Sequence, residues 1–311
     1  MEELVEKLKS SLGKNHEDTI ETMQMLAGCY MGNKEYEIAI TILKETLEKQ
    51  KSNLGENHKT TFNTMTKLAE CYKENNQYKS AIRILEETLE KRKLSLGEND
   101  SDTLYTMSML EYYYRLNNQY DMAVKVLEEL FANQKSILGE DHKETLEIMQ
   151  VLGVCYRKNE NYQTAITILE ETFKKQKSIL GENHEDTLKT MQMLVDLYIK
   201  NKQYDLAKLT LEETYERQKS ISGENHYKTL EIMQMFANVA ECYMGNKNYR
   251  IAITILEETF EKQKLIFGEN HEDTLETMQM LADCYNEKEQ CQEEKRNRKR
   301  NRKGRKKCII I

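Results

Sequence analysis

The sequence predicts an all-α protein built from stacked helix pairs, and three observations support this fold class. The 311 residues include no Pro and only 12 Gly, so few residues interrupt a helix. Seven of those glycines recur at intervals of 42 residues, with a last interval of 45. Within each interval the apolar residues are spaced by three and four, which places them on one helical face. One helix pair cannot bury such a face alone, so we expect neighbouring pairs to share a core.

Each repeat is predicted to hold a first and a second helix joined by a short polar turn. The first helix of the first repeat carries its apolar face at Thr19, Met23, Leu26, Ala27 and Tyr30. The second carries it at Tyr36, Ala39, Ile42, Leu43 and Leu47. We expect Gly13 and its copies to supply the positive φ that ends a helix, and Asn15 and Asp18 to cap the next one.

The repeats divide the chain into three segments. Residues 1–15 are predicted to hold a half-repeat helix at 2–12, residues 16–290 the repeat array, and residues 291–311 a disordered tail. The repeats start near 16, 58, 100, 142, 184, 226 and 271. Six complete pairs are expected at about 16–53, 58–95, 100–137, 142–179, 184–221 and 226–266. A seventh first helix at 271–288 closes the array, because the apolar pattern stops near Cys291.

The order Met23, Leu26-Ala27, Tyr30, Ala39 and Leu43 resembles the tetratricopeptide repeat (TPR). The 42-residue length, with the linker LG-x-x-H-x-x-T, resembles the repeats of kinesin light chains and nephrocystin-type proteins more than the usual repeat of about 34 residues. This resemblance implies a right-handed TPR superhelical solenoid of about six and a half helix-turn-helix repeats. It also implies a non-enzymatic scaffold that binds a protein or peptide partner in a concave groove lined by the first helices.

The resemblance places the groove contacts one residue after the Met23 series, where glutamine offers donors and an acceptor to a peptide backbone. The candidates are Gln24, Thr66, Ser108, Gln150, Gln192, Gln234, Gln279, Tyr112, Arg115 and Arg157. The third repeat departs from its sisters, because Glu111 occupies a slot that otherwise holds a small or apolar residue. A buried carboxylate is costly unless it is paired. Glu111 is therefore either sequence drift with local opening or a ligand contact that faces the groove.

No motif for a nucleotide, a metal or a catalytic centre is found, so we expect no enzymatic activity, cofactor or metal. Six histidines share one repeat position, about 20 Å apart by the spacing of packed helices, so they cannot share a zinc ion. We expect them to serve in capping or packing. Five of the seven cysteines also share one position, filled by Tyr113 and Leu197 in the other repeats, so we expect them to be buried without disulfides.

The last 17 residues combine a basic segment with a C-a-a-X box. Ten of the 13 residues from Lys295 to Lys307 are basic, so the rest of a chain of net charge −7 carries −17. The sequence Cys308-Ile309-Ile310-Ile311 follows and resembles the ends of prenylated proteins. We expect a farnesyl or geranylgeranyl group on Cys308, with the basic residues binding an anionic cytoplasmic membrane face. Those basic residues are Lys295, Arg296, Arg298, Lys299, Arg300, Arg302, Lys303, Arg305, Lys306 and Lys307.

Two other functions stay open at this stage. The protein could be a soluble kinesin-light-chain-like cargo adaptor whose tail is incidental. It could instead be a nuclear or RNA-associated protein led by its basic tail, although the tail lacks aromatic residues for base stacking and the acidic body would repel a polyanion. Nucleic acid is therefore not the expected partner. The sequence does not specify the partner, the membrane or the oligomeric state.

Overall fold

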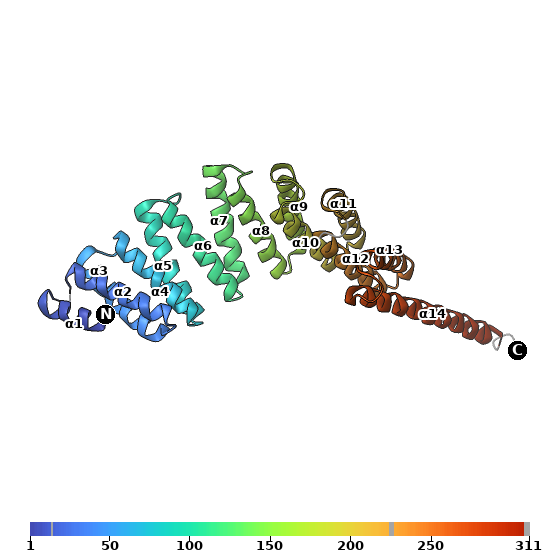
Figure 1. Ribbon diagram of the computed structural model, residues 1–311, viewed down its shortest axis with the longest axis horizontal. Coiled ribbons are helices and arrows are strands. Elements are labelled where there is room, and N and C mark those ends of the chain that lie inside the picture. The colour runs from blue at the N-terminus through green and yellow to red at the C-terminus, as the bar shows by residue number, and fades with distance from the viewer. Residues whose placement is uncertain (14, 224–226, 308–311) are drawn as a thin grey trace. The chain divides into compact units, whose positions relative to one another are not determined.

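The repeat pattern folds as an all-α solenoid in the computed structural model, which describes residues 1–13, 15–223 and 227–307 (Figure 1). Side chains are described for these residues except 221–222, 227–228, 230–231 and 299–307. Over the described residues the chain forms helices in unbroken succession, and it divides into two units. Unit 1 is Met1–Ile168, and unit 2 is Leu169–Ile311.

Unit 1 opens with α1 (Glu2–Ser11) and continues as first and second helices in turn. Its helices are α2 (Glu17–Gly32), α3 (Tyr36–Leu54), α4 (Lys59–Glu74), α5 (Tyr78–Leu96), α6 (Ser101–Leu116), α7 (Tyr120–Leu138) and α8 (Lys143–Lys158). The unit boundary falls inside α9 (Tyr162–Ile179). These bounds agree with the predicted pairs to within a few residues, because the 42-residue period fixes where each turn must lie.

Unit 2 contains the rest of α9 and five further helices. They are α10 (Glu185–Lys200), α11 (Tyr204–Ser222), α12 (Tyr227–Gly245), α13 (Tyr249–Phe267) and α14 (Glu272–Lys307). The three-residue insertion lengthens α12 to 19 residues, compared with 16 in α10. Three residues make nearly one helical turn, so Phe236 and Tyr243, on either side of the insertion, are both buried.

The core of unit 1 lies between the helices of a pair and between successive pairs. Ala27, Ala39, Ala69 and Ala81 are fully buried, and their small side chains let the helices approach closely. The repeated threonine supports the turn before each first helix, since the Thr61 hydroxyl donates to the Gly55 carbonyl oxygen at 2.9 Å. The same bond recurs from Thr19, Thr145, Thr187 and Thr229 to Gly13, Gly139, Gly181 and Gly223.

Glycine ends the second helices, as the sequence predicts. Gly97 has a φ of 97° and a ψ of 165°, a region that L side chains rarely adopt. The N-cap is neither Asn15 nor Asp18, contrary to that prediction, but the histidine itself, which confirms the capping role expected for the histidines. His16 Nδ1 accepts the backbone N–H of Asp18 at 3.3 Å. His58, His142, His184 and His271 do the same, whereas His226 lies outside the described residues.

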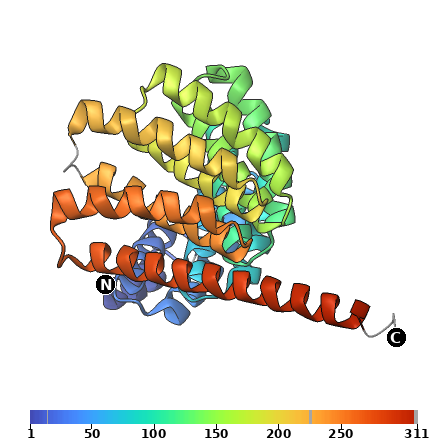
Figure 2. The same cartoon turned by 90° about the vertical axis from the view of Figure 1, so that its right-hand side faces the viewer.

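The C-terminal tail also differs from the prediction of disorder from residue 291. Helix α14 continues to Lys307 and extends well past α13 in unit 2 (Figure 2). Residues 291–303 contain neither Gly nor Pro and are rich in helix-favouring Glu, Gln, Lys and Arg. An ion pair of 3.5 Å between Glu294 and Arg298 spans one helical turn there. None of the described helices is long and apolar enough to cross a bilayer.

Candidate functional site

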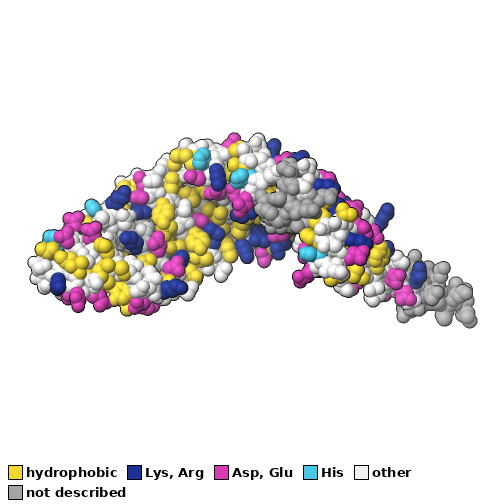
Figure 3. All heavy atoms as spheres, viewed as in Figure 1, with side chains coloured by type: hydrophobic (Ala, Val, Ile, Leu, Met, Phe, Trp, Pro, Cys, Tyr) yellow, Lys and Arg dark blue, Asp and Glu magenta, His cyan; other side chains and the backbone are white. Residues whose placement is uncertain are grey.

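The third repeat carries an aromatic and acidic cleft between α6, α7 and α8 in unit 1. The cleft holds about 430 Å³. Its apolar walls are Leu104, Leu127, Leu130, Ile148 and Val151, and its polar side chains include Ser108, Glu111, Gln134, Glu144 and Glu147. Hydrophobic side chains gather on the surface over α6 and its neighbours (Figure 3).

Helix α6 presents a stripe of exposed side chains at spacings of three and four. Tyr105 is 54% exposed and Tyr112 is 42% exposed, with exposed Ser108 between them. Each lies one turn from the next, so the three share one face. In the sister repeats the position of Tyr105 holds Glu, Asn or Lys. The third repeat therefore offers an aromatic surface where the sisters offer solvated polar groups.

Glu111 lines the cleft and is paired, which resolves the cost of burying its carboxylate. It is 7% exposed, and Arg115 donates to it twice, from Nε at 2.7 Å and from a terminal nitrogen at 3.2 Å. The Arg115 guanidinium also lies 5.3 Å from the centre of the Tyr112 ring. Burial raises the pKa of Glu111, and the hydrogen bonds from Arg115 oppose that rise. Arg115 therefore contacts both Glu111 and Tyr112, and these contacts hold the three side chains together beside the cleft.

The other acidic groups of the cleft come from α8. Gln134, a neutral side chain, donates from Nε2 to the Glu144 carboxylate at 2.6 Å. Glu147 lies 3.7 Å from Lys143 in an exposed pair, which contributes little binding energy. No Lys, Arg or His lines the cleft among the described residues. The cleft therefore has an apolar floor and an excess of negative charge at its rim.

The predicted groove residues differ in how far they are exposed to solvent. Ser108, Tyr112 and Gln279 are exposed, whereas Gln24, Gln192, Gln234, Arg115 and Arg157 are half-buried. Gln24 donates to the Thr64 hydroxyl and so links α2 to α4. Thr66 and Gln150 are buried, each with an exposed fraction of 8%. The Thr66 hydroxyl is already bonded to the backbone of its own helix, to the Asn63 carbonyl at 2.9 Å.

Tyr105, Glu144 and Glu147 are cleft residues that the sequence prediction missed. A signal for Tyr105 was present, because a tyrosine stands where the sister repeats carry polar residues. Glu144 and Glu147 gave no such signal, since acidic residues are frequent at both positions in the other repeats. Their importance comes from the neighbouring second helix, α7, which brings Leu127 and Leu130 against them.

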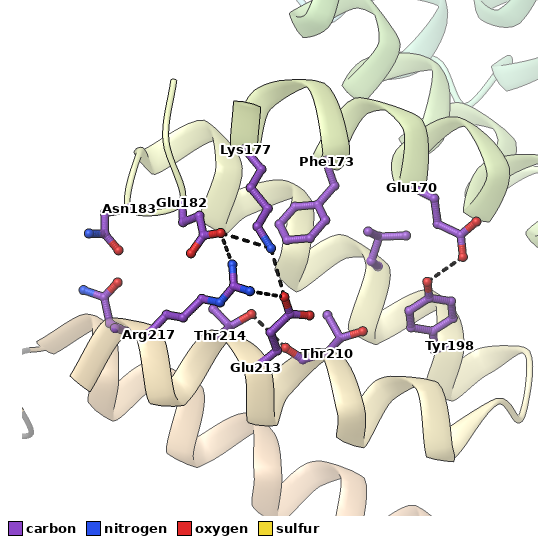
Figure 4. A pocket seen from close by; sticks show the side chains of 12 residues that line it. Glu170, Phe173, Lys177, Glu182, Asn183, Tyr198, Thr210, Glu213, Thr214 and Arg217 are labelled. Carbon is purple, nitrogen blue, oxygen red and sulfur yellow. Dashed lines mark hydrogen bonds and ion pairs between the residues drawn. The ribbon is translucent and has the colours of Figure 1, made fainter. Parts of the chain in front are cut away.

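A second cavity, of about 150 Å³, lies in unit 2 and contrasts with the cleft (Figure 4). Lys177 lies 3.1 Å from Glu182 and 3.0 Å from Glu213, and Arg217 pairs with the same two carboxylates. The Tyr198 hydroxyl donates to Glu170 at 2.6 Å. Two cations and two anions therefore satisfy one another across successive repeats. This network fastens α9, the α9–α10 loop and α11 together.

The predicted tail residues lie partly outside the described region. Lys295, Arg296 and Arg298 are exposed on α14. The side chains of Lys299, Arg300, Arg302, Lys303, Arg305, Lys306 and Lys307 are outside the described residues, as is the whole of Cys308. Cys71, Cys155 and Cys284 are buried as predicted. Cys29 is exposed, contrary to the prediction, because α1 is too short to reach it.

The tetratricopeptide repeat family model matches residues 18–94, 105–177, 145–220 and 231–296, which is more than half of the chain. The chain belongs to the tetratricopeptide repeat family. This membership, with the helix pairs described above, identifies it as a protein of a class that generally serves as interaction scaffolds. A search of curated protein sequences gave no match.

Solved structures of similar fold include kinesin-light-chain-type repeats. A candidate kinesin light chain from Podosopora anserina, with nearly identical TPR-like repeats, is 25% identical, with a TM-score of 0.56 over 66% of this chain and 97% of that one. BtubC (BKLC) from P. vanneervenii is 15% identical, with a TM-score of 0.52 over 71% and 88%. The C-terminal part of a TPR repeat-containing protein from Cytophaga hutchinsonii is 12% identical, with a TM-score of 0.57 over 88% and 92%. The last two similarities concern the fold alone.

Proposed function

We propose that this protein is a scaffold that binds a segment of a partner protein at the third-repeat cleft. The observation that supports this is the combination of exposed Tyr105 and Tyr112, an apolar floor and an acidic rim whose described lining residues include no cation. Tyrosine supplies large contact area at a low entropic cost and is enriched in binding hot spots. TPR proteins generally bind protein or peptide partners, so family membership supports the same conclusion.

The chemistry of the cleft favours a partner segment with an apolar side chain beside a Lys or Arg. The apolar residue would fill the space between Leu127, Leu130 and Ile148. The cation would lie near Glu144 and Glu147, where attraction steers association and selects against acidic segments. The ring of Tyr105 would contribute a cation–π contact from its exposed face.

A peptide-display library that contains all residue types tests this proposal. The full chain should enrich peptides that combine a basic and an apolar residue. Ser108→Arg places bulk and positive charge between the two tyrosines, and it should weaken those peptides about 10-fold or more. Ser136→Arg is the matched control, because Ser136 is exposed on α7 outside the cleft lining. Enrichment of acidic peptides, or equal binding by the Ser108→Arg variant, would refute the proposal.

The kinesin-light-chain-like alternative is not adopted. The similarity to kinesin-light-chain-type structures covers the repeats, and repeats of this kind are shared by scaffolds of several kinds. Those repeats alone do not indicate attachment to a motor.

We also propose, from the sequence alone, that a chain ending at Ile311 is prenylated on Cys308 and held at the cytoplasmic face of a membrane. One lipid chain gives marginal binding, and ten basic residues before Cys308 would supply the second signal. Intact mass and membrane fractionation of wild type and Cys308→Ser test this. Wild type should gain the mass of a prenyl group and sediment with membranes, and Cys308→Ser should do neither. An unmodified, unsedimented wild type would exclude the anchor.

A further inference from the structure

Helix α14 exposes an apolar face that the other first helices bury. Met278 is 48% exposed, whereas the methionines at the same position of the six preceding repeats are all between 0 and 4% exposed. Those six are Met23, Met65, Met107, Met149, Met191 and Met233. Leu275 is 44% exposed, compared with 5% for Ile20 and 1% for Leu146 at its position.

The exposure has a simple cause. In the pairs α2–α3, α4–α5, α6–α7, α10–α11 and α12–α13 the second helix folds back and packs on the first helix. Within the described residues no second helix follows α14, which instead runs on as one polar helix to Lys307. The face around Leu275 and Met278 therefore lacks the helix that covers its counterparts.

Helix α1 has the complementary deficit. Leu12-Gly13 aligns with Leu54-Gly55, so α1 corresponds to residues 44–53, the C-terminal half of the second helix α3. Val5 packs against α2 and is only 3% exposed. Leu47, the equivalent residue of α3, is 6% exposed. The opposite side of α1 is uncovered. Leu4 is 50% exposed, although Thr46 at its position is fully buried.

We propose that α1 of one copy docks on the Leu275–Met278 face of α14 in a second copy and completes a seventh helix pair head to tail. The chain itself supplies the model for this contact, because a second helix packs on its first helix in the five pairs named above. In the first pair the end of α3 lies beside the start of α2, with Lys49 Nζ 3.5 Å from the Met23 sulfur. Lys7 of α1 is the equivalent of Lys49, and it would lie beside Met278 of the other copy.

The proposed contact is heterologous, so each copy offers one α1 end and one α14 face. Such contacts build open chains of copies rather than closed dimers unless their geometry closes a ring. One half-length helix on one helix face buries little area, so the association is expected to be weak, with a Kd of about 10 µM to 1 mM. The proposal is independent of the partner cleft in the third repeat.

Sedimentation of the full chain from about 5 to 500 µM tests this inference. The mean mass of wild type should rise steadily with concentration, and for a Kd below about 0.5 mM it should exceed that of a dimer at about 500 µM. Leu275→Lys/Met278→Lys blocks the α14 face, and Leu4→Lys blocks α1. Each should raise the Kd at least about 10-fold and leave the circular dichroism spectrum unchanged, because all three residues are already exposed. Leu94→Lys is the matched control, since Leu94 is 89% exposed on α5.

A mixing experiment identifies the two surfaces. The α1-blocked and α14-blocked variants should each stay monomeric, and an equimolar mixture should form dimers that grow no further. Each such dimer pairs the intact α14 face of one variant with the intact α1 of the other. A wild type that is monomeric at 500 µM would overturn the proposal. So would a Leu4→Lys variant that still associates while the α14 variant does not, because that result indicates a symmetric α14 contact.

Discussion

Helix α4, inside unit 1, and helix α14, the last helix of unit 2, carry nearly the same pattern in different surroundings. Met65 and Met278 occupy the same repeat position, yet Met65 is 1% exposed and Met278 is 48% exposed. Both first helices follow a complete pair. Only α4 is also followed by its own second helix among the described residues. Burial in this protein is therefore a property of neighbouring helices more than of the helix itself, as expected for a nearest-neighbour array.

The largest expected difference between the two helices is in the stability lost when the equivalent methionine is replaced by alanine. Met65→Ala should lower the free energy of unfolding by about 2–5 kcal/mol, because it removes buried contacts and leaves a cavity. Met278→Ala should change it by less than about 0.5 kcal/mol, because the side chain already meets solvent. Urea denaturation measures both values. A protein concentration of about 1 µM keeps the chain below the range in which self-association is expected. Equal losses in the two variants would show that α14 is covered in solution.

The cysteines extend the comparison to the other end of the array. Burial raises the pKa of Cys71 to about 11, and its sulfur lies 3.5 Å from the carbonyl oxygen of Tyr36, at the start of α3. Cys29, at the same repeat position, is exposed because α1 has no corresponding turn. A thiol reagent at pH 8 should therefore modify Cys29 at least about 100-fold faster than Cys71. Peptide mapping of the modified protein measures both rates, and Cys29→Ser should leave the Cys71 rate unchanged.

A smaller contrast is expected between two tyrosines that make the same hydrogen bond. The Tyr198 hydroxyl donates to Glu170 and the Tyr285 hydroxyl to Glu257, each at 2.6 Å. Tyr198 is 5% exposed and Tyr285 is 41% exposed. Tyr198→Phe should therefore cost about 1 kcal/mol and Tyr285→Phe about 0.3 kcal/mol or less. Thermal unfolding followed by circular dichroism compares the two, and a larger cost at Tyr285 would contradict the order.

The sequence determines most of the fold because period and helical spacing are local properties that the chain repeats. Residues such as Gly97 and Ala81 mark helix ends and close packing in every complete repeat, so helix bounds and pairing are predictable. Two predictions failed where the surroundings matter, namely the burial of Cys29 and the capping of α2 by Asn15 or Asp18. The exposure of Cys29 depends on the length of α1, and the cap role of His16 depends on the backbone before α2.

The candidate site was predictable only in part. Glu111 and Tyr112 stand out in the sequence because they break the repeat pattern, and Ser108 and Arg115 because they belong to the predicted groove face. All four lie at or beside the cleft. The burial of Gln150 could not be foreseen from its sisters, since Gln279 at the same position is exposed. A pattern of identical residues predicts identical surroundings only where the neighbouring repeats are also identical.

The smallest expected effect is the pH dependence of stability that comes from Glu111. The equivalent residue in α4 is Ala69, which is fully buried. Burial, opposed in part by Arg115, raises the pKa of Glu111 in the folded protein above its ordinary value of 4.5. The folded state thus holds this proton more tightly than the unfolded chain. Stability should therefore be higher below pH 4.5 and fall as the pH rises towards the folded pKa.

Glu111→Gln removes this titration while keeping the shape of the side chain. The difference in unfolding free energy between wild type and Glu111→Gln should shift by about 1 kcal/mol or less, against wild type, as the pH rises above 4.5. Urea denaturation at several pH values between 4 and 7 measures this shift, and Glu21→Gln, at an exposed site on α2, provides the control. A shift in favour of wild type would mean that Arg115 lowers the pKa of Glu111 more than burial raises it. The third repeat would then hold its carboxylate ionised at no cost, ready to act at the cleft across this pH range.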